Sequence, residues 1–590
     1  MCLRLCCLLL YLALPCTLHA EDGPSPDKLV GLWGSEQVYG PAAKGPLTLD
    51  GRGSDWQAEV AGFQAAVQHA RDEVSFSLPG DQGSFRGRVS RDGTYIEGFW
   101  TQPTGITFNM GYATPLRLTR SAKGIWRGEV KPLPDRASFY LAVSRDEHGI
   151  LKAFLRNPEF NFGMRRLYTI TLDGDQVKLD DSLRKGDVLR GHYDSEQDLL
   201  SITLQGIGSF DFTRRDRDHA LGFYPVTPAV DHYAYRQPVP EDDGWRTASL
   251  REAGLDPKPL EALVQSILDT RTEGFSTPYI QGLLVAHHRK LALEEYFYGF
   301  DGERAHDSRS SGKTLAGTLT GIALDHGAKF RLDSPVVPLY PQYRDLANPD
   351  PRKRKITVQD LLTMDSGLAC DDNDDASPGN EDAMQEQKAQ RDWYRFILDV
   401  PMQDEPGDKK AVYCTAAINL LGGVVQQGTG MPLADFFQRY YAGPLDIRDY
   451  HMDLMPTGEA YMGGGIYLKP RDMLKLGQLY LDGGTWNGKR VLSRAWTEAA
   501  TVQHSYFPAS DYAPGHGYGY TWHLFEVQYG GKTYKEYMAQ GNGGQLVMVV
   551  PALDLAVLIT AGNYGNFPTW RKFFEDYMPR YLIPAAQSGH

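Results

Sequence analysis

Short apolar and aromatic runs, broken by glycine and aspartate, follow one another from Leu29 to Asp231. Typical runs are TYIEGFWTQ, GIWRGEV and LLSITLQGIG, in which apolar side chains alternate with polar ones. Because successive side chains of a strand point to opposite faces, this alternation is typical of half-buried strands, and turn signals such as Asp173-Gly174 separate them. The pattern predicts an all-β barrel or sandwich of antiparallel strands over residues 21–234.

The pattern changes at residues 235–249, YRQPVPEDDGWRTAS, whose proline and acidic residues predict a linker. Next, DPKPLEALVQSILDT has apolar residues at helical spacing, with Asp256 as N-cap. Strand-like runs lie at both ends of the remaining sequence, the first as two strands joined at Arg289-Lys290, and mostly helical sequence lies between them. We therefore expect an α/β sandwich, an antiparallel sheet flanked by helices, over residues 250–590.

The N-terminus, MCLRLCCLLLYLALPCTLHA, combines one arginine, an apolar run of about ten residues and a small residue at Ala20. It predicts a secretory signal peptide over residues 1–20, and therefore export across the inner membrane to the periplasm. A membrane-spanning helix needs about 20 apolar residues. No segment of the chain supplies them, so no transmembrane segment is expected in the mature chain.

Two cysteines, Cys370 and Cys414, remain after removal of that segment, which carries the other four. In an oxidising compartment they form a disulfide or stay as two buried thiols, and the sequence leaves both possibilities open. Neither has a cysteine or histidine at ligand spacing, so no metal site is expected. The net charge of −13 disfavours nucleic acid as a partner, because a phosphate backbone requires a basic surface.

The spacing of a serine, two residues and a lysine occurs three times, starting at Ser25, Ser182 and Ser310. Of these, Ser310 opens an amphipathic helix pattern, SSGKTLAGTLTGIALDHG. There the hydroxyl lies beside unpaired backbone N–H groups, and Lys313, one turn later, lies on the same face. An apolar, electropositive environment lowers the pKa of a lysine, so that its amine can accept the serine proton. The alternative is an N-capping serine followed by a solvated lysine.

The Ser310 segment follows a predicted strand hairpin and precedes three further stretches, KITVQDLLTMDSGLACDD, PGDKKAVYCTAAINLLGGVVQQGTG and YMAQGNGGQLVMVVPALDLAVLITAGNYG. This order of motifs resembles the serine β-lactamase and penicillin-binding-protein family, in particular its class C-like esterases and 6-aminohexanoate-dimer hydrolases. The resemblance covers most of residues 245–590 and implies an α/β sandwich of the β-lactamase/DD-peptidase type. No G-x-S-x-G motif occurs, which excludes an α/β-hydrolase nucleophile elbow.

The resemblance implies a role for each matching residue. Ser310 would be the acylated nucleophile and Lys313 its base. The second motif of the family, tyrosine-x-asparagine, corresponds to YCT, in which Tyr413 would relay a proton to the leaving group. The alternative for this tyrosine is a cap on a buried helix. Thr415 stands in place of the asparagine and offers a substrate a shorter hydrogen-bonding group.

The third motif of the family is a basic residue, serine or threonine, and glycine, and the corresponding stretch here is AQG. The basic residue is missing, so a β-lactam carboxylate would lose its charge partner, and Gln540 borders the site instead. Gly541 would let the backbone approach a substrate, and the N–H groups of Asn542 and Ser310 would form the oxyanion hole. The two glycines that follow Asn542 alternatively mark a bulge.

Two more stretches are candidates for the surroundings of the site. GGGIYLKPRD, residues 463–472, forms either a wall of the site or a tight turn. CDDNDDASPGNED, residues 370–382, resembles half of a calcium loop, but Ala376 replaces the required glycine and Asp382 the final glutamate. No calcium is therefore expected there, and a solvated lid segment near the cleft is the favoured interpretation.

The sequence therefore predicts an exported serine hydrolase that cleaves a small-molecule ester or amide through an acyl-enzyme, without a metal or organic cofactor. The enzymatic alternative is a β-lactamase or D-alanyl peptidase of the cell envelope. The alternative of a different class is a catalytically inactive binding or scaffold protein on the same fold, which the altered second and third motifs favour.

Overall fold

The computed structural model describes residues 24–38, 40–103, 110–133, 136–159, 166–182, 186, 188–204, 208–270, 276–386, 391–510 and 514–587. The predicted signal peptide, residues 1–20, lies outside these ranges. Among the described helices, none combines the length and the apolar character that crossing a membrane requires.

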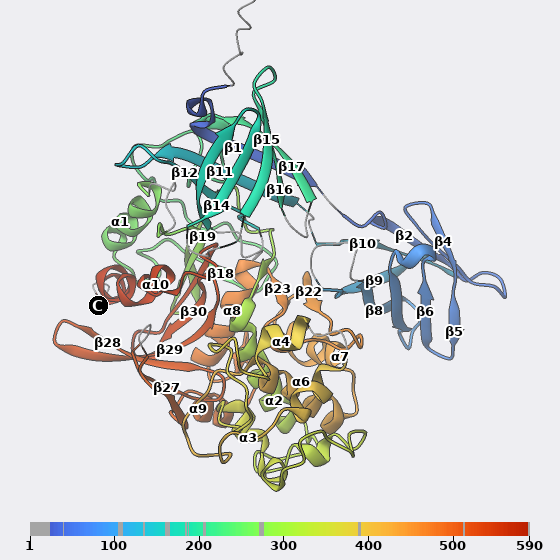
Figure 1. The fold of residues 1–590 in the computed structure, drawn as a ribbon. Coiled ribbons are helices and arrows are strands. Elements are labelled where there is room, and N and C mark those ends of the chain that lie inside the picture. Colours follow the sequence, from blue (N-terminus) through green and yellow to red (C-terminus); the bar gives the residue numbers. More distant parts are fainter. Residues whose placement is uncertain are drawn as a thin grey trace, which may run out of the picture.

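The first β-structure is a closed antiparallel barrel, at the top of Figure 1. Strand β1 closes it by pairing with β11 on one side and with β17 on the other, which leaves no free sheet edge. Apolar side chains such as Trp33, Leu200 and Phe212 are fully buried and form its core. The barrel strands are β1 (Gly31–Val38), β11 (Arg136–Arg145), β12 (Leu151–Arg156), β13 (Arg166–Asp173), β14 (Gln176–Asp181), β15 (Val188–Asp194), β16 (Leu199–Leu204) and β17 (Gly208–Arg215).

A second antiparallel sheet is inserted between β1 and β11, in blue at the right of Figure 1. It has its own buried core, which includes Leu49, Trp100 and Leu118. The strands expected in one β-domain over residues 21–234 are therefore divided between two sheets. Alternation at period two identifies strands but not their partners, so the sequence pattern does not reveal the insertion. In sheet order the strands are β4 (Phe63–Ala66), β3 (Gln57–Val60), β2 (Gly45–Asp50), β10 (Ile125–Val130), β9 (Tyr112–Ala122), β8 (Tyr95–Gln102), β7 (Ser84–Val89), β6 (Glu73–Ser77) and β5 (Gln68–Ala70).

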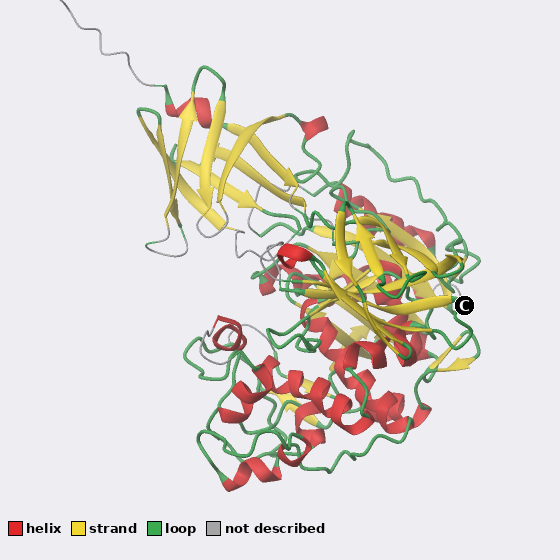
Figure 2. Ribbon diagram, turned by 90° about the vertical axis from the view of Figure 1, so that its right-hand side faces the viewer, coloured by secondary structure: helices red, strands yellow, loops and turns green. Residues whose placement is uncertain are grey.

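A third sheet forms the centre of the region after residue 245, and Figure 2 shows the barrel at one end of the molecule. Its neighbouring strands β19 and β31 come from opposite ends of this region. The hairpin between β19 and β20 turns at His288-Arg289, one residue before the predicted position. In sheet order the strands are β18 (Arg246–Thr247), β20 (Lys290–Tyr296), β19 (Ile280–His287), β31 (Leu555–Ala561), β30 (Gln545–Val550), β29 (Lys532–Gly541), β28 (His523–Tyr529), β27 (His516–Tyr518) and β26 (Ser505–Phe507).

Both faces of this sheet are covered by helices, which makes the region an α/β sandwich. Leu283 and Val285 of β19 pack into one apolar cluster with α1 and α12, whereas Leu284 and Ala286 pack into another with α2, α6 and α8. The helices are α1 (Pro257–Leu268), α2 (Lys313–Asp325), α3 (Val358–Leu362), α4 (Glu381–Glu386), α5 (Trp393–Asp399), α6 (Thr415–Thr429), α7 (Leu433–Phe437), α8 (Pro470–Leu481), α9 (Arg494–Ala500), α10 (Phe567–Trp570), α11 (Lys572–Glu575) and α12 (Ile583–Gln587).

Short strands connect the inserted sheet to the α/β sandwich. β9 pairs with β22 (Tyr450–Asp453), β22 with β23 (Ile466–Leu468), and β23 with β21 (His306–Asp307). The hydroxyl of Thr114 in β9 also lies 2.7 Å from Nδ1 of His451 in β22. Backbone hydrogen bonds therefore run from the inserted sheet to the strand that immediately precedes the S-x-x-K motif.

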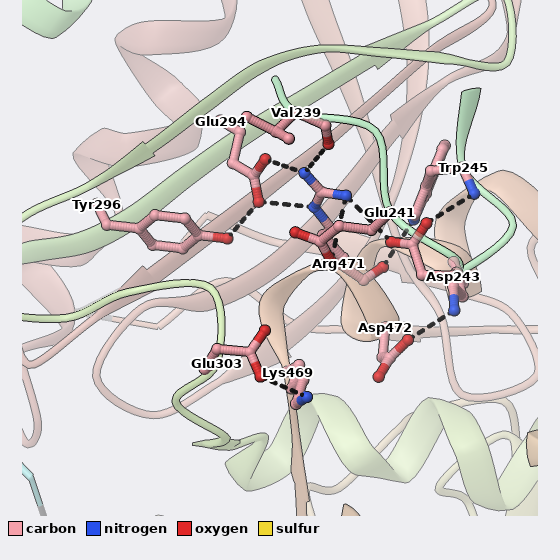
Figure 3. Close-up of polar contacts among 11 residues, drawn as sticks. Val239, Glu241, Asp243, Trp245, Glu294, Tyr296, Glu303, Lys469, Arg471 and Asp472 are labelled. Atoms are coloured by element: carbon pink, nitrogen blue, oxygen red, sulfur yellow. Dashed lines mark hydrogen bonds and ion pairs between the residues drawn. The ribbon is translucent and has the colours of Figure 1, made fainter. Parts of the chain in front are cut away.

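Residues 235–249, predicted to form a linker, pack against α8 (Figure 3). Arg471 of α8 donates to the carbonyl of Val239 at 2.8 Å and to the carboxylate of Glu294, also at 2.8 Å. Trp245 is buried, and its Nε1–H donates to the carbonyl of Arg471 at 3.1 Å. These contacts fix the segment to the α/β sandwich.

Candidate active site

Ser310 lies in a 3-10 turn, η4 (Arg309–Gly312), that leads directly into α2. The N–H of Ser308 donates to the carbonyl of Ile466 in β23 at 2.9 Å. The N–H of Arg309 donates to the carboxylate of Asp307 at 2.8 Å. Arg309 has a φ of 47°, a conformation that is unfavourable for residues with a Cβ and that is found at functional turns. These contacts hold the turn in one shape, while the side chain of Ser310 stays partly exposed.

Lys313 lies beside this serine, and its Nζ donates a hydrogen bond of 2.7 Å to Ser310 Oγ. Its side chain is almost completely buried, with 2% of the residue exposed. Burial is the main reason that the pKa of Lys313 lies below its usual 10.5, and the charge of Arg309 lowers it further, against the opposing effect of Glu381 and Asp372. An amine with a lowered pKa at this distance can take the proton of the serine hydroxyl.

Tyr413 completes this group of side chains. Lys313 Nζ lies 5.0 Å from the centroid of its ring, and the phenol lies beside the side chain of Ser310. Cys414 caps α6 and is bonded to Cys370 in a disulfide, which fixes the backbone next to the tyrosine. Burial raises the pKa of Tyr413 above its usual value, and the neighbouring Ser310 side chain opposes this only in part. The phenol therefore keeps its proton at neutral pH and is available as a proton donor.

Thr415, expected to offer a hydrogen bond to the substrate, is fully buried. Its N–H and its hydroxyl both donate to Asp372 Oδ2, at 2.8 and 2.5 Å, because these groups in the first turn of α6 require an acceptor. Asp372 also accepts the N–H of Glu381 at 2.8 Å. Burial, together with the charge of Glu381, raises the pKa of Asp372 to about 6. The acidic stretch 370–382, expected as a solvated lid, is therefore anchored to α6.

The end of β29 runs past the turn that holds Ser310. A Cβ on Gly541 would lie 2.4 Å from the carbonyl oxygen of Ser308, so the approach requires glycine. The next residue, Asn542, is half-buried, and its Oδ1 accepts the N–H of Gly565 at 2.9 Å. This places the backbone of Gly541 against η4, as an oxyanion hole built from β29 requires.

The residues on either side of Gly541 have different environments. Gly543 and Gly544 form the turn from β29 to β30, with φ angles of 94° and 100°. Gln540, which replaces part of the family's third motif, is half-buried, and its Nε2 donates to the sulfur of Met538 at 3.4 Å. A neutral amide therefore occupies the position of the motif's serine or threonine.

Gly464 forms a second wall beside the nucleophile turn. A Cβ at this position would lie 2.6 Å from the carbonyl oxygen of Arg309 and 3.1 Å from the nitrogen of Ser310, and its carbonyl accepts the Ser308 hydroxyl at 3.1 Å. Of the two alternatives for the stretch GGGIYLKPRD, the wall is therefore the one that the structure favours.

Sequence reasoning missed the groups that position the site. Asp307 forms an ion pair of 3.1 Å with Arg309 behind the turn, and Asp372 holds the start of α6. Asp307 and Arg309 both precede the S-x-x-K motif within three residues. Their opposite charges at this position are the sequence signal from which the ion pair could be predicted. Asp372 lies within the acidic stretch that the sequence predicts as a lid, and its separation of 43 positions from Thr415 conceals the contact.

Residues 261–569 match the family model described as Beta-lactamase. A curated relative, the 6-aminohexanoate-dimer hydrolase of Paenarthrobacter ureafaciens, is 28% identical over 255 residues, which cover 41% of this chain but only 59% of that protein. Among solved structures, a putative beta-lactamase from Bacteroides dorei aligns with a TM-score of 0.45 and 17% identity, over 56% of this chain and 99% of that chain. A putative 6-aminohexanoate-dimer hydrolase from Bacillus anthracis aligns with a TM-score of 0.43 and 17% identity, over 62% of this chain and 89% of that chain.

Proposed function

The chain belongs to the beta-lactamase family, and on that premise we propose that it is a serine hydrolase that cleaves an ester or amide through an acyl-enzyme. The observation that carries the proposal is the hydrogen bond of 2.7 Å between Nζ of the buried Lys313 and Oγ of Ser310. A lysine buried for stability alone would be expected beside a carboxylate, whereas this one lies beside a partly exposed hydroxyl.

In the acylation step, Ser310 Oγ attacks the substrate carbonyl while its proton passes to the neutral amine of Lys313. The new C–O bond places a negative charge on the carbonyl oxygen, which the N–H groups of Ser310 and Asn542 stabilise. When the tetrahedral intermediate collapses, the bond to the leaving group breaks, and Tyr413 gives that group its proton. Lys313 then returns its proton to the tyrosine.

In the deacylation step, a water molecule attacks the acyl carbonyl and the same residues act in reverse. The water gives a proton to the neutral amine of Lys313, the bond between Ser310 Oγ and the acyl carbon breaks, and the serine oxygen takes that proton back from Lys313. The products are a carboxylic acid and a free enzyme, and each step conserves charge and protons without a metal or an organic cofactor.

The substrate that we propose is a small ester or amide without a carboxylate next to the scissile bond. Ala539, at the position of the motif's basic residue, offers a β-lactam carboxylate no cation, and the hydroxyl of Thr415 is already bonded to Asp372. We also propose that the protein acts after export, in the periplasm, because residues 1–20 have the pattern of a secretory signal peptide.

The proposal is tested with the purified mature chain and a panel of esters, linear amides, D-alanyl peptides and a chromogenic β-lactam. Turnover of an ester or amide, with an acyl adduct in the intact mass that Ser310→Ala removes, is the expected result. The neighbouring Ser311, whose hydroxyl donates to the carbonyl of Ser308 at 2.7 Å, provides the matched control Ser311→Ala. Failure of the wild-type protein to form an adduct with any acylating compound would favour the inactive scaffold instead.

A further inference from the structure

A cavity of 760 Å³ lies beside β28 in the α/β sandwich. It is bounded by the segment 501–503, by β27 and β28, by β29, and by the helical segment that includes Phe574. Ser310, Lys313 and Tyr413 are not among the residues that line it. The cavity is therefore separate from the candidate active site.

Glu536 lines this cavity, and its environment is unusual for a carboxyl group. The residue is 2% exposed, and none of the described residues gives a hydrogen bond to either of its carboxyl oxygens. Burial raises the pKa of Glu536 to about 8. A buried carboxyl without a partner is costly for the fold, and such groups in native structures call for an explanation.

Aromatic side chains surround the same part of the cavity. Phe525 lies directly opposite Glu536 in the pairing of β28 with β29, so the two side chains share one face of the sheet. The ring centroid of Phe525 lies 5.3 Å from that of Phe574 and 4.8 Å from that of His516, which is stacked on it. All of these residues line the cavity.

The charges at the cavity favour a cation over an anion. Glu526 and Glu575 line it together with Glu536, against a single positive side chain among the described lining residues, Lys535. Glu575 is already paired with Arg571 at 2.9 Å, and Glu526 lies directly opposite Lys535 in the pairing of β28 with β29, which leaves Glu536 as the acidic lining group without a neighbour of opposite charge at ion-pair distance in the described part of the chain.

We propose that this cavity binds a small organic cation, an ammonium or amidinium group carried on an apolar chain, with Glu536 as its counter-ion and Phe525 and Phe574 as its walls. Aromatic rings attract cations, and a bound cation would give the buried carboxyl both a charge partner and a hydrogen-bond donor. A neutral apolar ligand would leave Glu536 as it is. The proposal goes beyond the hydrolase function and does not depend on Ser310.

The test is a calorimetric titration of the full mature chain with n-butylammonium chloride and, as the neutral counterpart of equal length, n-butanol. Saturable binding of the cation, at least tenfold tighter than that of the alcohol, is the expected result. Equal binding of the two compounds, or no saturation by butylammonium, would overturn the proposal.

Three variants locate the site. Glu536→Gln should weaken butylammonium binding at least tenfold. Val502→Trp fills the cavity from a residue that is 52% exposed, so it should fold normally and also lose binding. Ser310→Ala should bind as the wild type does. Unchanged binding in Val502→Trp, or loss of binding in Ser310→Ala, would place the cation elsewhere and overturn the proposal even if Glu536→Gln fails to fold.

Discussion

Lys313 and Lys475 are both buried in the α/β sandwich, and they differ in what lies beside their ammonium groups. Lys475 of α8 donates to the carboxylate of Asp472, one turn earlier, at 2.6 Å. Lys313 donates to the neutral hydroxyl of Ser310 at 2.7 Å. A buried cation with an adjacent counter-ion is stabilised in its charged form, whereas one beside a hydroxyl is destabilised in that form and tends to lose its proton.

The surroundings of the two lysines extend this difference. Around α8 the basic groups are paired with carboxylates, and Figure 3 shows Arg471 between Glu241, Asp243 and Glu294. These contacts hold residues 235–249 against the sandwich, so their role is structural. Around Ser310 the burial of an amine and a phenol shifts the pKa of both groups, as is typical of sites that transfer protons.

The largest expected effect concerns Lys313→Met, which keeps the volume of the side chain and removes its amine. The rate at which a fluorophosphonate modifies Ser310 should fall about 1,000-fold, because among the described residues Lys313 is the base that is hydrogen-bonded to Ser310 Oγ. The free energy of unfolding in urea should not fall, since a desolvated charge is removed. A rate within tenfold of the wild-type value would remove the lysine from the mechanism.

The same substitution at the other lysine, Lys475→Met, should lower the stability of the fold and leave the acylation rate nearly unchanged. It leaves the carboxyl of Asp472 buried without its counter-ion, and should lower the free energy of unfolding by about 3–5 kcal/mol. Acylation of the folded fraction should stay within about twofold of the wild type. The double variant Lys475→Met/Asp472→Leu should regain most of the stability, and a single variant as stable as the wild type would show that this pair is not structural.

Tyr413→Phe should have an intermediate effect that depends on the leaving group. With an alkyl ester, whose alcohol requires a proton as it departs, turnover should fall about 100-fold. With an aryl ester, whose phenolate departs without one, the loss should stay below about tenfold. Steady-state kinetics of the two esters measure this contrast, and equal losses would indicate that the tyrosine only shapes the site.

The smallest effect is expected for Glu241, which is the most exposed of the three carboxylates paired with Arg471. Glu241 lies 3.4 Å from Arg471 with 47% of its side chain exposed, whereas the side chain of Glu294 is 10% exposed. Glu241→Gln should therefore lower the free energy of unfolding by less than about 1 kcal/mol, because solvent screens the pair. Urea titration measures the change, and a loss as large as that of Lys475→Met would mean that exposed and buried pairs contribute alike.

The sequence predicts the parts of the site that depend on local structure. Ser310 and Lys313 are one helical turn apart, so their spacing and the apolar pattern that follows bring them to one face. Tyr413 is identified through its resemblance to a family motif, and strands are identified by alternation. Each of these signals is contained within a short stretch of the chain.

The remaining features depend on contacts between distant parts of the chain. The acceptor of the Thr415 hydroxyl is Asp372, 43 residues away, and the partners of Arg471 lie more than 170 residues upstream. The insertion of β2 to β10 into the barrel is hidden because both sheets have the same alternation. The sequence around Glu536 predicts a strand but gives no sign that this carboxyl group is buried. Its burial results from the packing of the assembled sandwich.

The most direct test of the central claim, that a desolvated amine takes the proton of Ser310, is the rate of adduct formation at this serine from about pH 5 to about pH 10, mapped by peptide mass spectrometry. Because burial lowers the pKa of Lys313, the rate should rise with pH as the amine loses its proton, with a midpoint below the usual 10.5, and then level off. A rate that does not change with pH, a midpoint at or above 10.5, or an adduct on Ser308 or Ser311 would contradict the claim.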